Sequence, residues 1–526
     1  MDKAKKAFEV AKQILRWIWK VILSTLFIAG VFFQTPLKLL LLILVFLLAC
    51  TILPLRFRKW FWAAVGVVIL IFVVWVFLPE NDEGWKPFTF DKELAALEAK
   101  YKIPDEENAA IIYNQLVADY NKSEIEPNFI TDQVDNIISS EYWLAKDYPE
   151  VAKWIKSHKE TISKLMQASQ FEKCKFDITS KTFLFFDINR TGAIRRWAQL
   201  LSKASNNDIA EGRTAKGLGK IYCTLNMGEH LYQQPLLVDI LVGISVKSLA
   251  ISHLNNFVIT GSPNKKQLDK IEEFIGEIKY DWQSDLPRVL DYEKLFTKNM
   301  LSSMIYETNK NGEIRLSRNP ENAVRSFMPA ECNDIPSLPY LARKLSKASA
   351  VIKWLFVPSS PQELSKAIDL EYEKFYNMAD PDFDWSKKPP EVKFSFLSYK
   401  LNYEYFLKLQ SLLLSPSYYS IHGLYLRSDS SQRGALLLIA LRRYKDKNRS
   451  WPKSLDDIKG LTDEENFIDP LNGQSFVYKL ADGDFTLYSK GKNGEDDEGE
   501  RFSEYCGGTN VKKTADDIYI WRLKNK

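Results

Sequence analysis

The sequence predicts a mainly α-helical protein with N-terminal transmembrane helices, a helical soluble body that looks like a stack of helical hairpins, and a small α+β C-terminal domain. Three observations support this prediction. Apolar runs crowd the first 78 residues, helical apolar spacing continues from about residue 91 to 430, and short strand-like runs with Gly and Asn turns follow. A chain of 526 residues is long enough for three domains, which we expect at 1–78, 79–430 and 431–526.

The N-terminal segment is expected to lie in a lipid bilayer. Its clearest run, Trp60–Leu78, has 19 residues and no charge, which matches the roughly 20 apolar residues that span a membrane. Two further runs, at about 17–33 and 37–55, carry Lys20 and Lys38. A lysine near the end of a span can reach the interface with its amino group. Three helices are therefore predicted, and whether the first two both cross the membrane stays open.

The basic residues predict the orientation of this anchor. Residues 1–78 carry a net charge of +8, so the rest of the chain carries −4 of the overall +4. Basic clusters lie before residue 17 and at 56–59, and the positive-inside rule places both in the cytoplasm. We therefore expect a protein of the bacterial inner membrane with its N-terminus in the cytoplasm and everything after residue 79 in the periplasm. The acidic soluble part argues against a nucleic-acid partner.

The body between residues 91 and 430 reads as helix after helix with short connections. Pro104 and Pro149 each precede acidic residues, as at helix starts. The run 235–254, PLLVDILVGISVKSLAISHL, is apolar around most of its circumference, which predicts a central helix. Two segments rich in Asn, Gly, Asp and Pro, at 307–340 and 379–392, predict loops.

The sequence offers little sign of catalysis. The stretch Glu211–Lys220, EGRTAKGLGK, has no Lys-Ser/Thr pair after its glycines, so a turn between helices is favoured over a phosphate loop. The four histidines are scattered without metal-ligand spacing and are expected to be structural: His158, His230, His253 and His422. The five cysteines form no CxxC pair, so disulfide pairing stays open. No catalytic or cofactor-binding residue is assigned.

The C-terminal segment resembles the periplasmic domain of the major pseudopilin of type II secretion over about residues 432–521. An apolar helix is followed by an aromatic-Pro pair, an Asp-Pro turn, a Leu-Tyr-Ser-x-Gly strand end and a closing Asp-Asp-Ile. These patterns are carried by Tyr444, Lys445, Trp451, Pro452, Asp469, Pro470, Gly473, Leu487, Tyr488, Ser489, Gly491, Asp516, Asp517 and Ile518. The whole chain also resembles a group of uncharacterised bacterial envelope proteins that join a membrane anchor to a helical body.

The pseudopilin resemblance implies a Ca²⁺ site in the acidic loop near the C-terminus. In that family the loop binds calcium through carboxylates and backbone carbonyls, and the matching residues here are Asn493, Asp496, Asp497, Asp516 and Asp517. A hard cation that takes 6–8 oxygens suits such a cluster. A solvated acidic turn is the alternative. The sequence departs from the family at the N-terminus, KKAFEVAKQ, which lacks the Gly of a prepilin-peptidase site.

These expectations favour a membrane-anchored scaffold that contacts protein partners in the cell envelope. An accessory component of a type II secretion or pilus-like assembly is one alternative. An enzyme with a site assembled from distant residues of the helical body is another, and a deep pocket with converging His, Asp or Glu would favour it.

Overall fold

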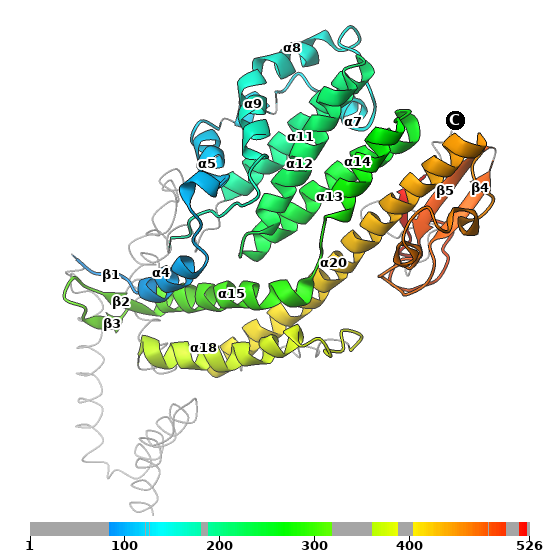
Figure 1. Cartoon of the computed structure of the whole chain (residues 1–526). Helices are drawn as coiled ribbons and strands as arrows, with labels where there is room; N and C mark the ends of the chain where they lie inside the picture. Colours follow the sequence, from blue (N-terminus) through cyan, green and yellow to red (C-terminus); the bar gives the residue numbers. More distant parts are fainter. Residues whose placement is uncertain are drawn as a thin grey trace, which may run out of the picture. The chain divides into compact units, whose positions relative to one another are not determined.

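A computed structural model describes residues 84–120, 122–125, 127–179, 188–317, 360–387, 403–481, 483–500 and 515–522. This part of the chain is mostly helical with small antiparallel sheets, which confirms the predicted helical class (Figure 1). The chain forms two compact units. The first unit comprises Met1–Phe90, Phe296–Lys374 and Pro390–Leu414, and the second comprises Asp91–Leu295, Phe375–Pro389 and Ser415–Lys526.

The centre of the second unit is a layer of three consecutive helices that run side by side (Figure 1). They are α11 (Ile188–Ala210), α12 (Thr214–Tyr232) and α13 (Leu237–Thr260). The connection after α11 is only three residues long and turns at Gly212, whose φ is +76°. The favoured turn is therefore confirmed at Glu211–Arg213, whereas the glycines that follow lie inside α12. Helix α13 buries residues on most of its circumference, as its apolar sequence predicts.

Two glycines let α12 and α13 approach closely. A Cβ atom on Gly228 would lie 2.9 Å from the carbonyl oxygen of Gly243, and one on Gly243 would lie 2.7 Å from the carbonyl oxygen of Gly228. Side chains larger than hydrogen would push the two backbones apart at this crossing.

Shorter helices of the second unit cover this layer on the α11 side (Figure 1). Their buried core includes Tyr113, Leu116, Trp154 and Leu165, packed with Trp197 of α11. Proline begins one of them, as predicted, at Pro149. These helices are α5 (Ala110–Ala118), α6 (Lys122–Ile125), α7 (Asp132–Ser140), α8 (Pro149–Ser157) and α9 (Lys159–Ala168). Helix α4 (Asp91–Lys100) also belongs to the second unit.

A second buried cluster joins α13, the capped helix α14 (Lys265–Gly276), helix α20 (Tyr403–Asn448) and the C-terminal sheet. Every residue from Ala435 to Leu441 is buried. The α20 residue Gln432 donates hydrogen bonds to the carbonyl oxygens of Ile275 and Ile278. Its neighbour Gly434 lies against Ile520 in the sheet. This part of α20 is apolar all round because it packs between helices on one side and strands on another.

The C-terminal sheet has the order β4-β5-β6 and is antiparallel. Its strands are β4 (Val477–Ala481), β5 (Asp484–Ser489) and β6 (Ile518–Trp521), which confirms that short strands follow the helical body. The buried carboxylate of Asp469 accepts a 2.5 Å hydrogen bond from the Ser489 hydroxyl. A hydrogen bond therefore connects the Asp-Pro turn directly to the Leu-Tyr-Ser-x-Gly strand end.

In the first unit, a small sheet has the order β1-β2-β3, formed by β1 (Lys86–Pro87), β2 (Tyr306–Thr308) and β3 (Ile314–Leu316). The predicted loop at 307–340 is wrong over its start, because Asn309 to Gly312 form the turn of a hairpin between β2 and β3. The unit also holds the end of α15 (Trp282–Ile305) and most of α18 (Pro361–Tyr376), joined by an ion pair between Lys298 and Asp369.

The second predicted loop, at 379–392, is a series of turns from Asp380 to Lys387, and its remaining residues after Lys387 lie outside the described ones.

The predicted transmembrane runs at 17–33, 37–55 and 60–78 lie outside the described residues. Among the described residues, α13 is the one helix long and apolar enough to cross a membrane. Of its most apolar window, 56% is buried within the protein, as in the core helix of a globular unit.

Candidate functional site

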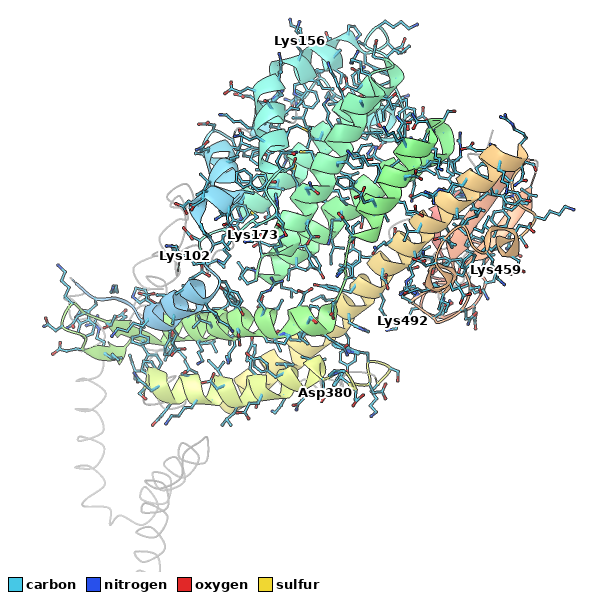
Figure 2. The ribbon with its side chains drawn as sticks, viewed as in Figure 1. Lys102, Lys156, Lys173, Asp380, Lys459 and Lys492 are labelled. Atoms are coloured by element: carbon cyan, nitrogen blue, oxygen red, sulfur yellow. The ribbon has the colours of Figure 1, made fainter. Side chains whose placement is uncertain are left out.

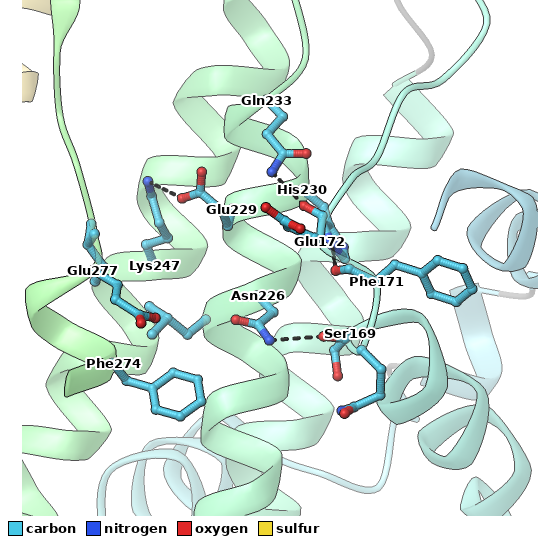
Figure 3. A pocket seen from close by; sticks show the side chains of 13 residues that line it. Ser169, Phe171, Glu172, Asn226, Glu229, His230, Gln233, Lys247, Phe274 and Glu277 are labelled. Carbon is cyan, nitrogen blue, oxygen red and sulfur yellow. Dashed lines mark hydrogen bonds and ion pairs between the residues drawn. The ribbon is translucent and has the colours of Figure 1, made fainter. Parts of the chain in front are cut away.

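A groove with a volume of about 460 Å³ opens on the second unit between α12, α13, α14 and the segment Ser169–Glu172 (Figure 3). Its lining combines apolar, amide and charged side chains. It holds a histidine, a lysine and three glutamates, and His and Glu are among the residue types named above as favouring an enzyme. The lining residues that matter below are Glu172, Leu225, Asn226, Glu229, His230, Lys247, Phe274, Glu277 and Ile278.

His230 has both ring nitrogens engaged within the protein. Its Nε2 lies 2.8 Å from the carbonyl oxygen of Phe171, and its Nδ1 lies 3.0 Å from the hydroxyl of Tyr113. A carbonyl can only accept, so Nε2 carries the proton and Nδ1 accepts from Tyr113. Burial lowers the pKa of His230, which keeps the ring neutral. This histidine holds α5, α12 and the Phe171 segment together and leaves no ring nitrogen for a substrate.

Lys247 is fully buried although it carries a charge. Its Nζ lies 3.0 Å from Glu229 Oε2, 3.6 Å from the ring centre of Tyr232 and 4.4 Å from that of Tyr280. Burial lowers the pKa of Lys247 and the Glu229 carboxylate opposes that shift. The carboxylate and the two aromatic faces together replace the water that a buried ammonium has lost.

The remaining carboxylates give the groove a negative rim. Glu172 and Glu277 are exposed, and within the described chain neither forms an ion pair. Figure 3 shows them on opposite sides of the groove, one from the Ser169–Glu172 segment and one from the end of α14. Because Lys247 balances Glu229, the lining carries a formal charge of −2.

The acidic loop near the C-terminus is closed by Asp516 and Asp517. Oδ2 of Asp517 accepts hydrogen bonds from the backbone N–H groups of Gly499 (2.8 Å) and Asp497 (3.1 Å). Oδ2 of Asp516 accepts from the backbone N–H of Lys492 at 2.8 Å. The Oδ1 atoms of Asp516 and Asp517 are both buried, and no hydrogen-bond donor among the described residues reaches them. Asp517 is only 1% exposed, and its pKa is raised by burial and by the neighbouring charge of Asp497.

The other three predicted calcium ligands divide into two groups. Asn493 and Asp497 lie together, with Asn493 Nδ2 donating to Asp497 Oδ2 at 3.0 Å. Asp496 is directed elsewhere, since its carboxylate accepts from the Tyr488 hydroxyl at 2.6 Å and pairs with Lys479 at 3.4 Å. The loop thus gathers four of the five predicted residues. Across the described residues, however, no three or more His, Cys, Asp or Glu side chains are grouped so as to hold a metal ion.

Sequence reasoning missed the pair of Lys247 and Glu229. The one available signal is the single lysine in the largely apolar run 235–254. Such a lysine must either reach solvent or find a counter-ion, but its partner lies 18 residues earlier on another helix. The lysines labelled on this unit in Figure 2, such as Lys156 and Lys459, instead point outward from the surface.

Comparisons with protein families, with curated proteins and with solved structures find no match for this chain.

Proposed function

We propose that this protein is a scaffold anchored in the bacterial inner membrane, with its helical body and its C-terminal α+β segment in the periplasm, where they bind protein partners. The apolar runs and basic clusters of the first 78 residues support the anchor and its orientation. The observation that carries the binding role is the groove. Both of its titratable nitrogen-bearing side chains, His230 and Lys247, are already engaged by the protein itself.

This engagement is why binding is favoured over the enzyme alternative. A general base needs a nitrogen or oxygen within hydrogen-bond reach of a substrate proton. His230 is neutral and both of its ring nitrogens are hydrogen-bonded within the protein. The amino group of Lys247 is enclosed by Glu229 and two tyrosines. The groove is open, and the carboxylates at its rim have no counter-charge. It therefore offers charge and surface area for binding rather than an activated nucleophile.

We also propose that the acidic loop holds one Ca²⁺ ion. The support is the pair of buried Oδ1 atoms of Asp516 and Asp517, for which the described part of the chain supplies no hydrogen-bond donor. Buried anionic oxygens without a donor or a cation are costly. Two carboxylates are fewer than a calcium site needs, so backbone carbonyls of the loop would supply other ligands, as Ca²⁺ readily accepts. The ion would stabilise the loop and add no reactive group.

The type II secretion alternative has narrower support. The bonded pair Asp469 and Ser489 links two of the motifs that resemble the pseudopilin. A role in that assembly additionally requires physical association with its components.

Affinity purification of the full-length protein from native membranes tests the proposed function. We expect a small, reproducible set of envelope proteins at near-stoichiometric amounts, none of which is recovered with an unrelated tagged membrane protein. Secretion-system components in that set would support the alternative role. Recovery of the protein alone under several mild detergents would contradict the scaffold.

A further inference from the structure

The groove between α12, α13 and α14 has an apolar part and an acidic rim. Leu225, Phe274 and Ile278 provide the apolar surface, and Phe274 is braced by stacking on Tyr222 at 4.2 Å between ring centres. The rim carries Glu172 and Glu277. An uncompensated carboxylate beside a half-buried aromatic ring suits a ligand that is cationic at one end and apolar along its stem.

We propose that this groove binds a basic, extended peptide segment of the partner protein. A Lys or Arg stem packs on Phe274, and its charged head lies at the rim formed by Glu172 and Glu277. This inference rests on the proposed scaffold function and names the chemistry of its partner. The volume of about 460 Å³ lies within the range of ligand-binding pockets and suits a few side chains rather than a whole domain.

Charge complementarity selects this occupant over others. Lys247 cannot attract an acidic ligand, because its ammonium is enclosed and already neutralised by Glu229. A purely apolar segment would leave two carboxylates partly desolvated and unpaired. Asn226 also favours a peptide. Its nitrogen donates to the Ser169 carbonyl at 2.9 Å, and Figure 3 shows its amide oxygen turned away from Ser169, where it could accept a hydrogen bond from a backbone N–H in the groove.

Fluorescence anisotropy on the full-length protein in a nonionic detergent tests the proposal. The probe is a labelled hexapeptide in which Lys alternates with Ala and Phe, and its counterpart has Glu in place of each Lys. We expect the basic peptide to bind, the acidic one not to bind, and added salt to weaken the complex. The double variant Glu172→Gln/Glu277→Gln should weaken binding by about tenfold, as expected for the loss of two exposed ion pairs.

The matched control is Glu106→Gln/Glu373→Gln, which removes two exposed carboxylates outside the groove. It should leave the affinity unchanged, and equal thermal midpoints should show that both double variants are folded. Equal affinity for the two peptides, or equal losses in the two double variants, would overturn the groove assignment. So would displacement of the peptide by spermidine at equal charge concentration, because the site would then recognise small polyamines.

The two proposals can fail separately. If native membranes yield partners whose recovery is unaffected by Glu172→Lys/Glu277→Lys, the scaffold stands and the groove inference falls. If the peptide binds as described but no partner co-purifies, the groove chemistry stands and the scaffold function falls.

Discussion

At the scale of single residues, the second unit buries several groups that ordinarily carry charge. Lys247 keeps its charge beside Glu229, and burial lowers the pKa of His230 and keeps its ring neutral, while both of its ring nitrogens are hydrogen-bonded. His253 on α13 is 7% exposed, and burial lowers its pKa to about 4 from an ordinary 6.5. Each arrangement avoids an unpaired buried charge, which is the condition for placing such residues in a core.

His253 should make the stability of the protein fall in mild acid. Between pH 6.5 and 4 the unfolded chain binds a proton at this residue and the folded chain does not. The contribution of the neutral His253 to the free energy of unfolding is therefore fully present above pH 6.5. It declines as the pH falls toward 4, by roughly 2–3 kcal/mol. Denaturant unfolding of the full chain across this range should show a smaller decline for His253→Leu. Parallel curves for the two proteins would refute the assignment.

The acidic loop should respond to calcium through Asp517. If the loop holds Ca²⁺, a free concentration about a hundredfold above Kd stabilises the folded chain by about 2.7 kcal/mol through linkage. Asp517→Asn should remove that gain, whereas Asp496→Asn should retain it, because Asp496 bonds to Tyr488 and Lys479 instead. Mg²⁺ should substitute poorly, since it demands tighter octahedral geometry. Thermal unfolding of the full-length protein with EGTA, Ca²⁺ or Mg²⁺ measures this stabilisation. Three equal unfolding midpoints would mean that the loop is a solvated turn that binds no ion.

At the scale of elements, the pattern of apolar residues predicts well that a helix exists and that it is buried. It predicts less well where the helix begins and ends and which elements it packs against. The run 435–444 indicates a helix, and the structure places it within α20, which begins at Tyr403. The stretch 235–254 predicts a central helix and is one. The sequence predicts a long loop around the turn at 309–312, because the flanking strands β2 and β3 are only three residues each and are too short to show a strand pattern. The groove and the ion pair between Lys247 and Glu229 could not be predicted from the sequence, because both depend on the packing register of α12 against α13.

That register should depend on the two glycines at the crossing of these helices. Gly228→Ala and Gly243→Ala should each destabilise the protein by about 1–3 kcal/mol, since the added methyl meets backbone atoms that cannot move aside. Gly423→Ala is the matched control in α20, where a Cβ atom would have nothing within 4 Å. It should stabilise by up to about 1 kcal/mol through helix propensity. Denaturant unfolding measures all three, and similar values would refute the close-approach argument.

At the scale of the whole molecule, the predicted boundary between residues 430 and 431 falls inside α20. Within the second unit, one buried cluster contains Leu254 of α13, Leu437 of α20 and Phe485 of β5. Side chains from before and after residue 430 therefore share a core. The segment that resembles a pseudopilin packs its helix on two sides, whereas a helix that covers only a sheet needs one apolar face.

The periplasmic placement of everything after residue 79 depends on the predicted membrane orientation. One span or three spans before Pro79 place everything after it outside the cytoplasm, whereas two would return it to the cytoplasm. An alkaline phosphatase fused after Lys526 should therefore be active and a green fluorescent protein fused there dark. The same reporters placed directly after Lys59 serve as the control and should give the opposite pair of signals, because the cluster Arg56, Arg58 and Lys59 is retained inside. A fluorescent fusion at Lys526 with inactive phosphatase would mean an even number of spans. The groove and the acidic loop would then face the cytoplasm, where the low resting concentration of free Ca²⁺ would leave the loop without its ion.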